Sequence, residues 1–180
     1  MARTMELRPA TLADVPALAD LGRASFVAAF GELYSPQDLA AFLAQTHDEA
    51  VVAGEIAGAE CRHRLAVGED GSLVGYCKLR YPSKLAELSH AADPLELSQL
   101  YCAGQATGQG VGAALMAWAL EQARLGGHDA VHLSVYSENH GAQKFYARYG
   151  FAKIADTTFR VGDQVDAEFL FEKPLSGDMP

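Results

Sequence analysis

The sequence predicts a single mixed α/β domain, in which a central sheet of about six to seven strands is flanked by helices. The chain has 180 residues, a length that fits one domain with its own hydrophobic core. Hydrophobic residues make up 49% of the chain and charged residues 21%, as in an ordinary globular protein. Strand-like and helix-like patterns follow in the order strand, helices, two strands, strand–helix–strand–helix, two strands.

The first third of the chain is expected to be mainly helical. Residues 5–8 alternate between apolar and polar and predict a short first strand. Thr11 is a good N-cap, and the apolar spacing after it predicts a helix that ends near Gly31. The pair Ser35-Pro36 predicts the start of another helix, and residues 48–57 predict a further amphipathic one.

Turn signals divide the rest of the chain into strands and helices. The predicted strands are residues 64–67, 73–79, 95–102, 130–136, 152–160 and 165–172. The clearest helix spans residues 111–125, and Gly126-Gly127 ends it. One apolar face is predicted along this helix, formed by Val111, Leu115, Trp118 and Leu125. A last helix is predicted over residues 139–149, with Asn139 as its N-cap.

The net charge of the chain narrows the classes of partner. It is −9, which argues against nucleic acid, because phosphates need clustered Lys and Arg. An acidic surface attracts cationic ligands, but it also serves solubility, so charge alone does not select a substrate. No apolar stretch approaches the roughly 20 residues of a membrane span, and no signal sequence is apparent. We therefore expect a cytoplasmic protein with no membrane partner.

Cysteine and histidine residues predict no metal site. Cys61, Cys77 and Cys102 lack the spacing of a metal or redox motif and are expected to be reduced, buried thiols. His128 and His132 are four residues apart, but His132 falls in a predicted strand, so the two need not share a helical face.

A glycine-rich turn joins a predicted strand to the clearest helix. Its sequence is Thr107-Gly108-Gln109-Gly110-Val111-Gly112. The first N–H groups of a helix lack partners, and the helix dipole adds about half a positive charge there. Glycines let these N–H groups approach a phosphate with no side chain in the way. The turn therefore predicts a backbone cradle for a pyrophosphate.

Other interpretations of this turn stay open at this point. A nucleoside triphosphate loop would end in Gly-Lys-Ser/Thr, and no lysine lies here. Gly108, Gly110 and Ala113 match the G-x-G-x-x-A pattern of a dehydrogenase. That pattern belongs to the first strand–turn–helix unit, with an acid ending the next strand, whereas here Asp129 precedes it. A turn without any ligand is the third interpretation.

Residues 97–112 and 139–151 together resemble the two characteristic segments of the GNAT acetyltransferase superfamily. The first segment is similar to the acetyl-CoA motif of that family, a strand followed by [Arg/Gln]-x-x-Gly-x-[Gly/Ala]. Gly110 and Gly112 occupy its two glycine positions, and Thr107 stands where the family usually has Arg or Gln. This departure weakens a side-chain contact to the pyrophosphate and leaves the backbone cradle intact.

The second segment resembles the family stretch Asn-x-x-Ala-x-x-x-Tyr, which appears here as Asn139, Ala142 and Tyr146. The resemblance implies a single N-acetyltransferase domain over residues 1–180 with an acetyl-CoA-binding core at about 95–151. It implies acetyl-CoA as co-substrate, without a metal, and direct transfer to an amine in a ternary complex.

A narrower resemblance is to the bacterial spermidine/spermine N-acetyltransferases. It rests on Phe30 with Ser35-Pro36, on residues 96–101 and on residues 159–163. It implies a primary amine of a small molecule, such as a polyamine, as acceptor. Acetylation of a protein or peptide and a non-catalytic acyl-CoA sensor are the alternatives. Sheet edges of this kind often pair, so a homodimer is also considered.

The family resemblance implies roles for individual residues. Tyr146 corresponds to the general acid near the CoA sulfur, although without the resemblance it would be assigned to the aromatic core. Glu96 begins the strand before the glycine turn and is the candidate base, directly or through water, with Glu138 and Glu87 as rivals. The residues expected to contact acetyl-CoA are Leu100, Tyr101, Cys102, Thr107, Gly108, Gln109, Gly110, Val111, Gly112, Ala113, Asn139 and Tyr146.

Several residues in or near the predicted site carry a further hypothesis. The backbone of residues 100–102 is expected to pair with the pantetheine arm like an added strand, and its N–H groups could hold the thioester oxygen. Cys102 is considered as an acyl carrier, against which stands the usual inertness of buried thiols. Asn139 either contacts CoA or only caps its helix. His140 lies near the predicted site, where a plain surface position is the alternative to an effect on pH dependence.

Overall fold

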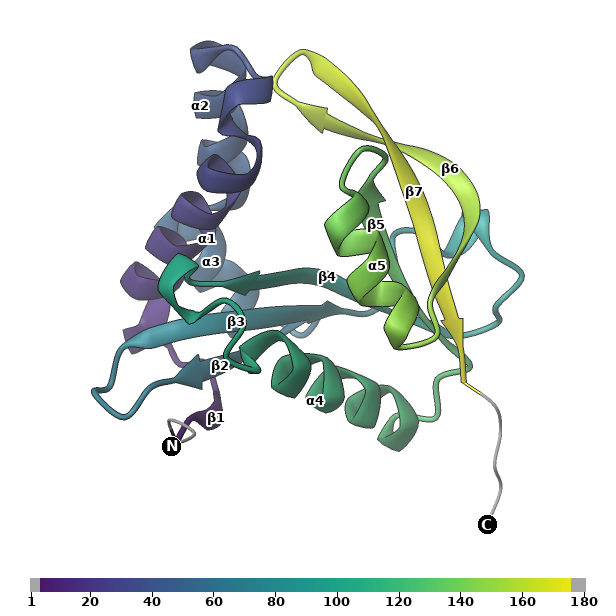
Figure 1. The fold of residues 1–180 in the computed structure, drawn as a ribbon, viewed down its shortest axis with the longest axis horizontal. Coiled ribbons are helices and arrows are strands. Elements are labelled where there is room, and N and C mark those ends of the chain that lie inside the picture. The colour runs from purple at the N-terminus through teal and green to yellow at the C-terminus, as the bar shows by residue number, and fades with distance from the viewer. Residues whose placement is uncertain (1–3, 176–180) are drawn as a thin grey trace.

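A seven-stranded sheet forms the centre of the computed structural model, which describes residues 4–175 (Figure 1). The strand order is β1-β2-β3-β4-β5-β7-β6, and only the pair β4–β5 is parallel. The strands are β1 (Glu6–Pro9), β2 (Cys61–Val67), β3 (Leu73–Arg80), β4 (Pro94–Cys102), β5 (Ala130–Tyr136), β6 (Ala152–Val161) and β7 (Gln164–Pro174). The mixed sheet and its strand number confirm the predicted fold class.

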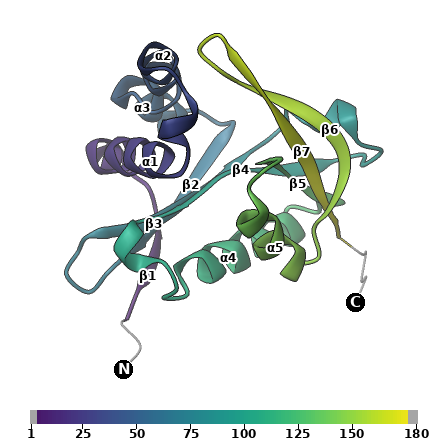
Figure 2. The same ribbon diagram turned by 45° about the horizontal axis from the view of Figure 1, so that its top comes forward.

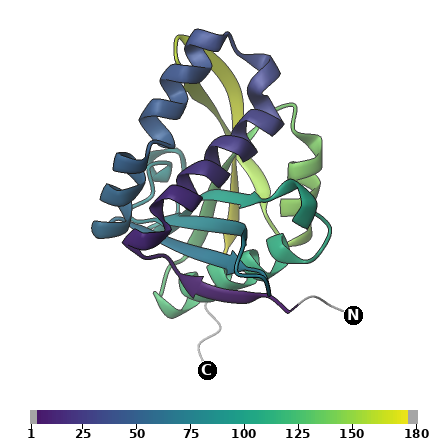
Figure 3. The same ribbon diagram turned by 90° about the vertical axis from the view of Figure 1, so that its left-hand side faces the viewer.

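Helices cover both faces of this sheet (Figure 2). The α-helices are α1 (Val15–Phe30), α2 (Pro36–Thr46), α3 (Glu49–Ala57), α4 (Val111–Leu125) and α5 (His140–Arg148). Short 3-10 helices are η1 (Leu12–Asp14), η2 (Gly31–Leu33), η3 (Ala86–Leu88) and η4 (Gly104–Ala106). α4 and α5 lie on one face and α1–α3 on the other, where α1 crosses the strands diagonally (Figure 3). Among the described residues, no helix is both long enough and apolar enough to cross a membrane.

The helix starts form as the sequence predicts. Thr11 and Asp14 form a capping box at η1, which leads into α1. The Ser35 hydroxyl accepts a hydrogen bond from the Asp38 N–H at 3.1 Å, and Pro36 occupies the first turn of α2. These side chains satisfy N–H groups that the helix itself cannot pair.

Two details of the predicted elements are wrong. Strand β2 begins at Cys61 and not at residue 64, because its first residues include the polar Arg62 and His63, and the strand pattern is carried there by a buried histidine. In α4, Leu125 is 73% exposed. The buried line of this helix instead follows Leu115, Ala119 and Ala123, because alanine allows close approach to the sheet.

Two buried histidines lie near the contact between the sheet and the α1–α3 layer. His47 and His63 are 1% and 7% exposed, and the His47 Nε2 and the His63 Nδ1 atoms have no hydrogen-bond partner within the described residues. Burial, together with the charge of Lys78, lowers the pKa of each imidazole to about 4. Both rings are therefore neutral in the folded protein at neutral pH.

This burial predicts a loss of stability in mild acid. The unfolded chain protonates its histidines near pH 6.5, above the folded pKa of about 4, so stability falls as the pH drops through this window. We expect a loss of about 2 kcal/mol per histidine between pH 7.5 and pH 5, measured by urea unfolding. The double variant His47→Gln, His63→Gln should show a weaker pH dependence than the variant His90→Gln, which changes an exposed histidine. Equal unfolding midpoints of the wild type at both pH values would contradict this assignment.

Candidate functional site

The central strands β4 and β5 separate midway along the sheet. Their parallel pairing covers only Pro94–Glu96 and Ala130–His132 and then stops. Beyond this point β4 pairs only with β3, and β5 only with β7. The facing N–H and C=O groups of both strands are thus free to bind an extended ligand inserted between them, as an added strand would.

Side-chain exposure shows that this separation is an opening. Ser134 is exposed although it lies in the middle of a central strand, between the buried residues Leu133 and Val135. The second half of β4, residues 98–102, is half-buried, whereas its first residues are buried. The predicted pantetheine-binding residues 100–102 therefore lie along this opening.

The glycine turn stands at the end of β4, before α4. Gly108 and Gly110 have φ angles of +76° and +83°, a region that L side chains rarely adopt. A Cβ atom at either position would meet nothing within 4 Å, so the space beside the backbone is open. The first-turn N–H groups of α4, from Val111 to Ala113, have no partner inside the helix. This geometry fits the backbone cradle for an anion that the sequence predicts.

Two side chains of the glycine turn donate hydrogen bonds to backbone carbonyls just before it in the chain. The Thr107 hydroxyl donates a hydrogen bond to the Gly104 carbonyl at 2.8 Å. The Gln109 amide donates to the Gln105 carbonyl at 2.7 Å. Both contacts shape the turn, and neither side chain occupies the backbone N–H groups that the sequence predicts as the anion-binding element.

Tyr146 lies on α5, with its ring in the aromatic core and its hydroxyl unpaired. The ring contacts Phe145 and Phe151, with centroid distances of 5.4 and 6.0 Å. The hydroxyl forms no hydrogen bond within the described residues. Burial, and then a negative charge on Cys102, raises the pKa of Tyr146 to about 12. The phenol is therefore neutral at physiological pH and able to donate a hydrogen bond.

Cys102 connects β4, α4 and α5. A Cβ atom placed on Gly112 would lie 3.7 Å from the Cys102 Sγ atom and 3.5 Å from the Phe145 ring. The structure thus brings the end of β4, the glycine turn and the Tyr146 helix together. All three cysteines are free, and burial raises the pKa of Cys102. A raised thiol pKa disfavours the acyl-carrier role.

Glu96 lies where the pairing between β4 and β5 ends, and it is buried. Its carboxylate accepts a hydrogen bond from the Lys84 N–H at 2.7 Å, which holds the connection between β3 and β4. Tyr101 follows Glu96 by five positions, so their Cα atoms are about 16 Å apart along an extended strand. No direct contact joins Glu96 to Tyr146 among the described residues.

The other predicted residues occupy the rim of the site or lie away from it. The Asn139 side chain accepts a hydrogen bond from the Ala142 N–H at 3.2 Å, so it caps α5. The Glu138 side chain is exposed and lies 3.6 Å from His140. Glu87 belongs to η3, in the connection between β3 and β4.

A polar group on β7 completes the opening, and the sequence analysis did not identify it. The Ser134 hydroxyl donates a hydrogen bond to the Glu168 carboxylate, and Glu168 pairs with Tyr136 in the strand register. The Tyr34 hydroxyl donates to Asp166 at 2.5 Å. This group could have been found in the sequence from the alternation of acidic residues along β7, which places them on the face opposite to the apolar Phe169 and Phe171.

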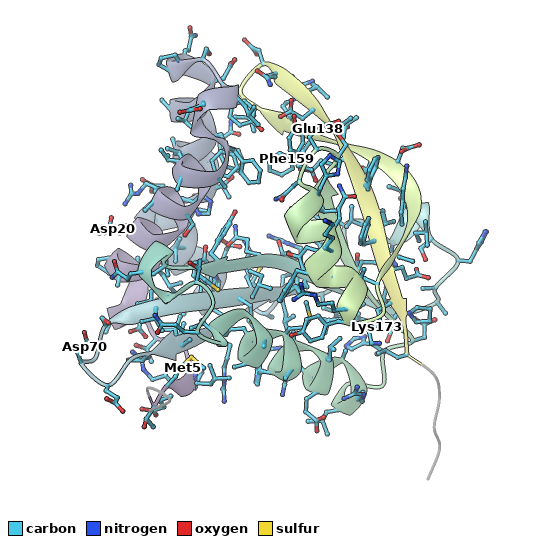
Figure 4. The ribbon with its side chains drawn as sticks, viewed as in Figure 1. Met5, Asp20, Asp70, Glu138, Phe159 and Lys173 are labelled. Atoms are coloured by element: carbon cyan, nitrogen blue, oxygen red, sulfur yellow. The ribbon has the colours of Figure 1, made fainter. Side chains whose placement is uncertain are left out.

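The tip of the β6–β7 hairpin packs against α2. The Asp163 N–H at this tip donates to the Asp38 carboxylate at 2.9 Å. Phe159 is directed toward the same helix, with its ring 5.4 Å from that of Phe42 (Figure 4). A Cβ atom on Gly162 would collide with Asp38, which shows how closely the two elements approach.

A groove of about 780 Å³ opens between the helical layer and the end of β5. The end of α1, η2 and α2 line one side, and Tyr136, Glu138 and Asn139 line the other. Within the described part of the chain, no cluster of His, Cys, Asp and Glu has the arrangement of a metal site.

Comparison with known proteins identifies relatives over most of the chain. Residues 23–151 match the model of the Acetyltransferase (GNAT) family. An uncharacterized N-acetyltransferase from Lactobacillus delbrueckii subsp. lactis is 32% identical over 165 residues, which cover 90% of this chain and 92% of that protein. An uncharacterized N-acetyltransferase from Mycobacterium tuberculosis is 29% identical over 164 residues, which cover 91% of this chain and 99% of that protein.

A solved structure shares the fold. The crystal structure of the PaiA N-acetyltransferase from Thermoplasma acidophilum, in complex with coenzyme A, superposes with a TM-score of 0.77. The alignment covers 96% of this chain and 99% of that protein, at 20% sequence identity.

Proposed function

Because the chain belongs to the acetyltransferase (GNAT) family, in which acetyl-CoA is the acetyl donor, we propose that it acetylates a primary amine of a small molecule. The amine attacks the thioester directly while donor and acceptor are bound together. The observation that carries this proposal is the separation of β4 and β5 beside the glycine turn and Tyr146. We expect the donor on the face of the sheet that carries α4 and α5, and the acceptor on the face covered by α1–α3, which is called the acceptor side below.

The donor is proposed to bind through the backbone. N–H groups of residues 108 and 110–113 would hold the pyrophosphate, whereas the Gln109 N–H already donates to the Ala106 carbonyl at 3.3 Å. The free edge of residues 100–102 would pair with the pantetheine arm. The positive φ angles of Gly108 and Gly110 and the open space beside them support this assignment. Asn139 would contribute by capping α5 and thereby positioning Tyr146.

Tyr146 is proposed to assist the leaving group. When the amine attacks, the carbon–sulfur bond breaks and the thiolate needs a hydrogen bond or a proton. The Tyr146 hydroxyl is neutral and has no other partner within the described residues, which supports this role. The mechanism also needs a base, because only the neutral amine has a lone pair. Glu96, predicted as that base, stays a prediction.

The acceptor is proposed to be small and cationic, with polyamines as first candidates. The contact of the β6–β7 tip with α2 would block access for a long chain from that side, which favours a small molecule over a protein segment. The net charge of −9 would attract an ammonium ligand. A peptide acceptor would need the β6–β7 tip to move away from α2.

A thiol-release assay tests this function. With acetyl-CoA, we expect CoA release that depends on an added amine and is fastest with spermidine or spermine. Aminoglycosides, amino acids and short peptides complete the panel, and controls without acceptor measure hydrolysis.

Different results would point to different functions. Turnover with short peptides alone would favour the peptide acetyltransferase. Binding of acetyl-CoA without turnover would favour the sensor. No binding of acetyl-CoA would overturn the proposal.

A further inference from the structure

The carboxylates on the acceptor side of the sheet differ in the hydrogen bonds that they already form. Both oxygens of Asp166 are engaged, Oδ2 by the Tyr34 hydroxyl at 2.5 Å and Oδ1 by the Gln164 amide at 2.8 Å. Glu96 accepts the Lys84 N–H at the closed end of the strand separation. In Glu168, Oε2 accepts the Ser134 hydroxyl, and Oε1 has no partner within residues 4–175. Glu168 therefore keeps a free acceptor atom.

Glu168 also faces the place where the strands separate. It pairs with Tyr136 near the end of β5, and the side chains of alternate residues share a face, so Glu168, Tyr136 and Ser134 lie on one side of the sheet. Ser134 is exposed because β4 has moved away from β5. A ligand that enters the opening would thus reach the Glu168 carboxylate.

Glu168 and Tyr146 both lie near enough to Tyr101 on β4 to influence it. Burial raises the pKa of Tyr101, and negative charge on Tyr146 and on Glu168 raises it further. Burial also raises the pKa of Glu168 itself, while the Ser134 hydrogen bond lowers it. The titratable groups around Glu168 are Asp166 on its own strand, Tyr34 before α2, Tyr136 on β5 and Tyr101 on β4. Glu168 forms no ion pair among the described residues.

We propose that Glu168 is the catalytic base of the acetyl transfer. Its carboxylate takes one proton from the ammonium group of the acceptor, so that an N–H bond breaks and an O–H bond forms. The freed lone pair then attacks the thioester carbon, and the carbon–sulfur bond breaks. The second proton that the nitrogen loses balances the proton gained at sulfur beside Tyr146. This inference rests on the proposed function and assigns the proton step to β7.

The variant Glu168→Gln tests the proton step and keeps the size of the side chain. We expect kcat at pH 7 to fall about 100-fold or more, with an unchanged KM for acetyl-CoA. Activity of the variant should rise about tenfold per pH unit toward the pKa of the amine, because solvent then supplies the neutral acceptor. Glu121→Gln, an exposed change of the same charge on α4, should match the wild type. The same measurements on Glu96→Gln compare the two candidate bases.

The variant Ser134→Ala tests the same role without removing the carboxylate. Loss of the Ser134 hydrogen bond should raise the pKa of Glu168. The acid limb of the kcat/KM profile should therefore move to higher pH, whereas a purely structural serine would leave the limb in place.

Two results separate this inference from the proposed function. A wild type that transfers acetyl groups, with an unmoved acid limb in Ser134→Ala and full activity in Glu168→Gln, would overturn only the base assignment. A loss of activity in Glu168→Gln that is the same at every pH would also overturn it. A wild type that binds acetyl-CoA and acetylates no amine would overturn the proposed function first.

Discussion

The variant Tyr146→Phe is expected to lower kcat by about 100-fold or more and to leave the KM for acetyl-CoA nearly unchanged. The substitution removes only the hydroxyl, which forms no hydrogen bond within the described residues, so the ring contacts with Phe145 and Phe151 remain. A hydrogen bond to the leaving sulfur develops as the carbon–sulfur bond breaks, and its loss therefore affects kcat more than binding. Steady-state kinetics with varied acetyl-CoA measures both constants.

A matched control lies on the same side of the molecule. Tyr149 also belongs to the aromatic cluster, with its ring 5.1 Å from that of Phe145, and follows the last residue of α5. Tyr149→Phe should keep kcat within a few-fold of the wild type. If Tyr146→Phe kept the wild-type kcat, the general-acid role would be wrong and Tyr146 would belong to the core alone.

The variant Gly110→Ala is expected to weaken acetyl-CoA binding about tenfold. A left-handed backbone costs an L residue roughly 1–2 kcal/mol, and about 1.4 kcal/mol corresponds to a factor of ten in affinity. Gly110 has a φ angle of +83°, so its replacement shifts the turn away from the conformation that presents its N–H groups. Changing Gly108, at +76°, as well should increase the loss further, although two changes in one turn need not add. Titration calorimetry measures the Kd directly.

The control for this prediction is Gly104→Ala in the same connection. Gly104 does not have a positive φ angle, and a Cβ atom there would meet nothing within 4 Å. Its replacement should leave the Kd unchanged. An unchanged Kd for the Gly108, Gly110 double variant would instead show that the turn is not the pyrophosphate site.

Local patterns were sufficient to predict most of the elements. Helix α4 and strand β5 have the bounds that the sequence predicts, because helical periodicity, the Gly126-Gly127 stop and the strand pattern are all short-range signals. The exposed end of α4 at Leu125 was not predictable in this way. Burial depends on which strand lies opposite, and the spacing within one helix does not contain this information.

The geometry of the glycine turn, which is proposed to hold the donor, was predictable from sequence for the same reason. The positive φ angles of the glycine turn depend on the residue type at Gly108 and Gly110, and the helix N-terminus that follows lies next to them in the chain. The packing of aromatic rings around the Tyr146 side chain could not be derived from the spacing of residues within α5 alone. The role of Tyr146 as an acid came from the family resemblance and stays a prediction.

The sequence by itself determined the elements, their order and the conformation of the glycine turn, since each depends on residues within one or two turns of one another. Only the tertiary structure decided how the proposed acceptor side is built. The separation of β4 from β5, the contact of Asp163 with Asp38 across 125 residues, and the position of Glu168 opposite Tyr136 all depend on strand pairing between distant segments. Such pairing reflects packing of the whole sheet against both helical layers, so no local pattern encodes it.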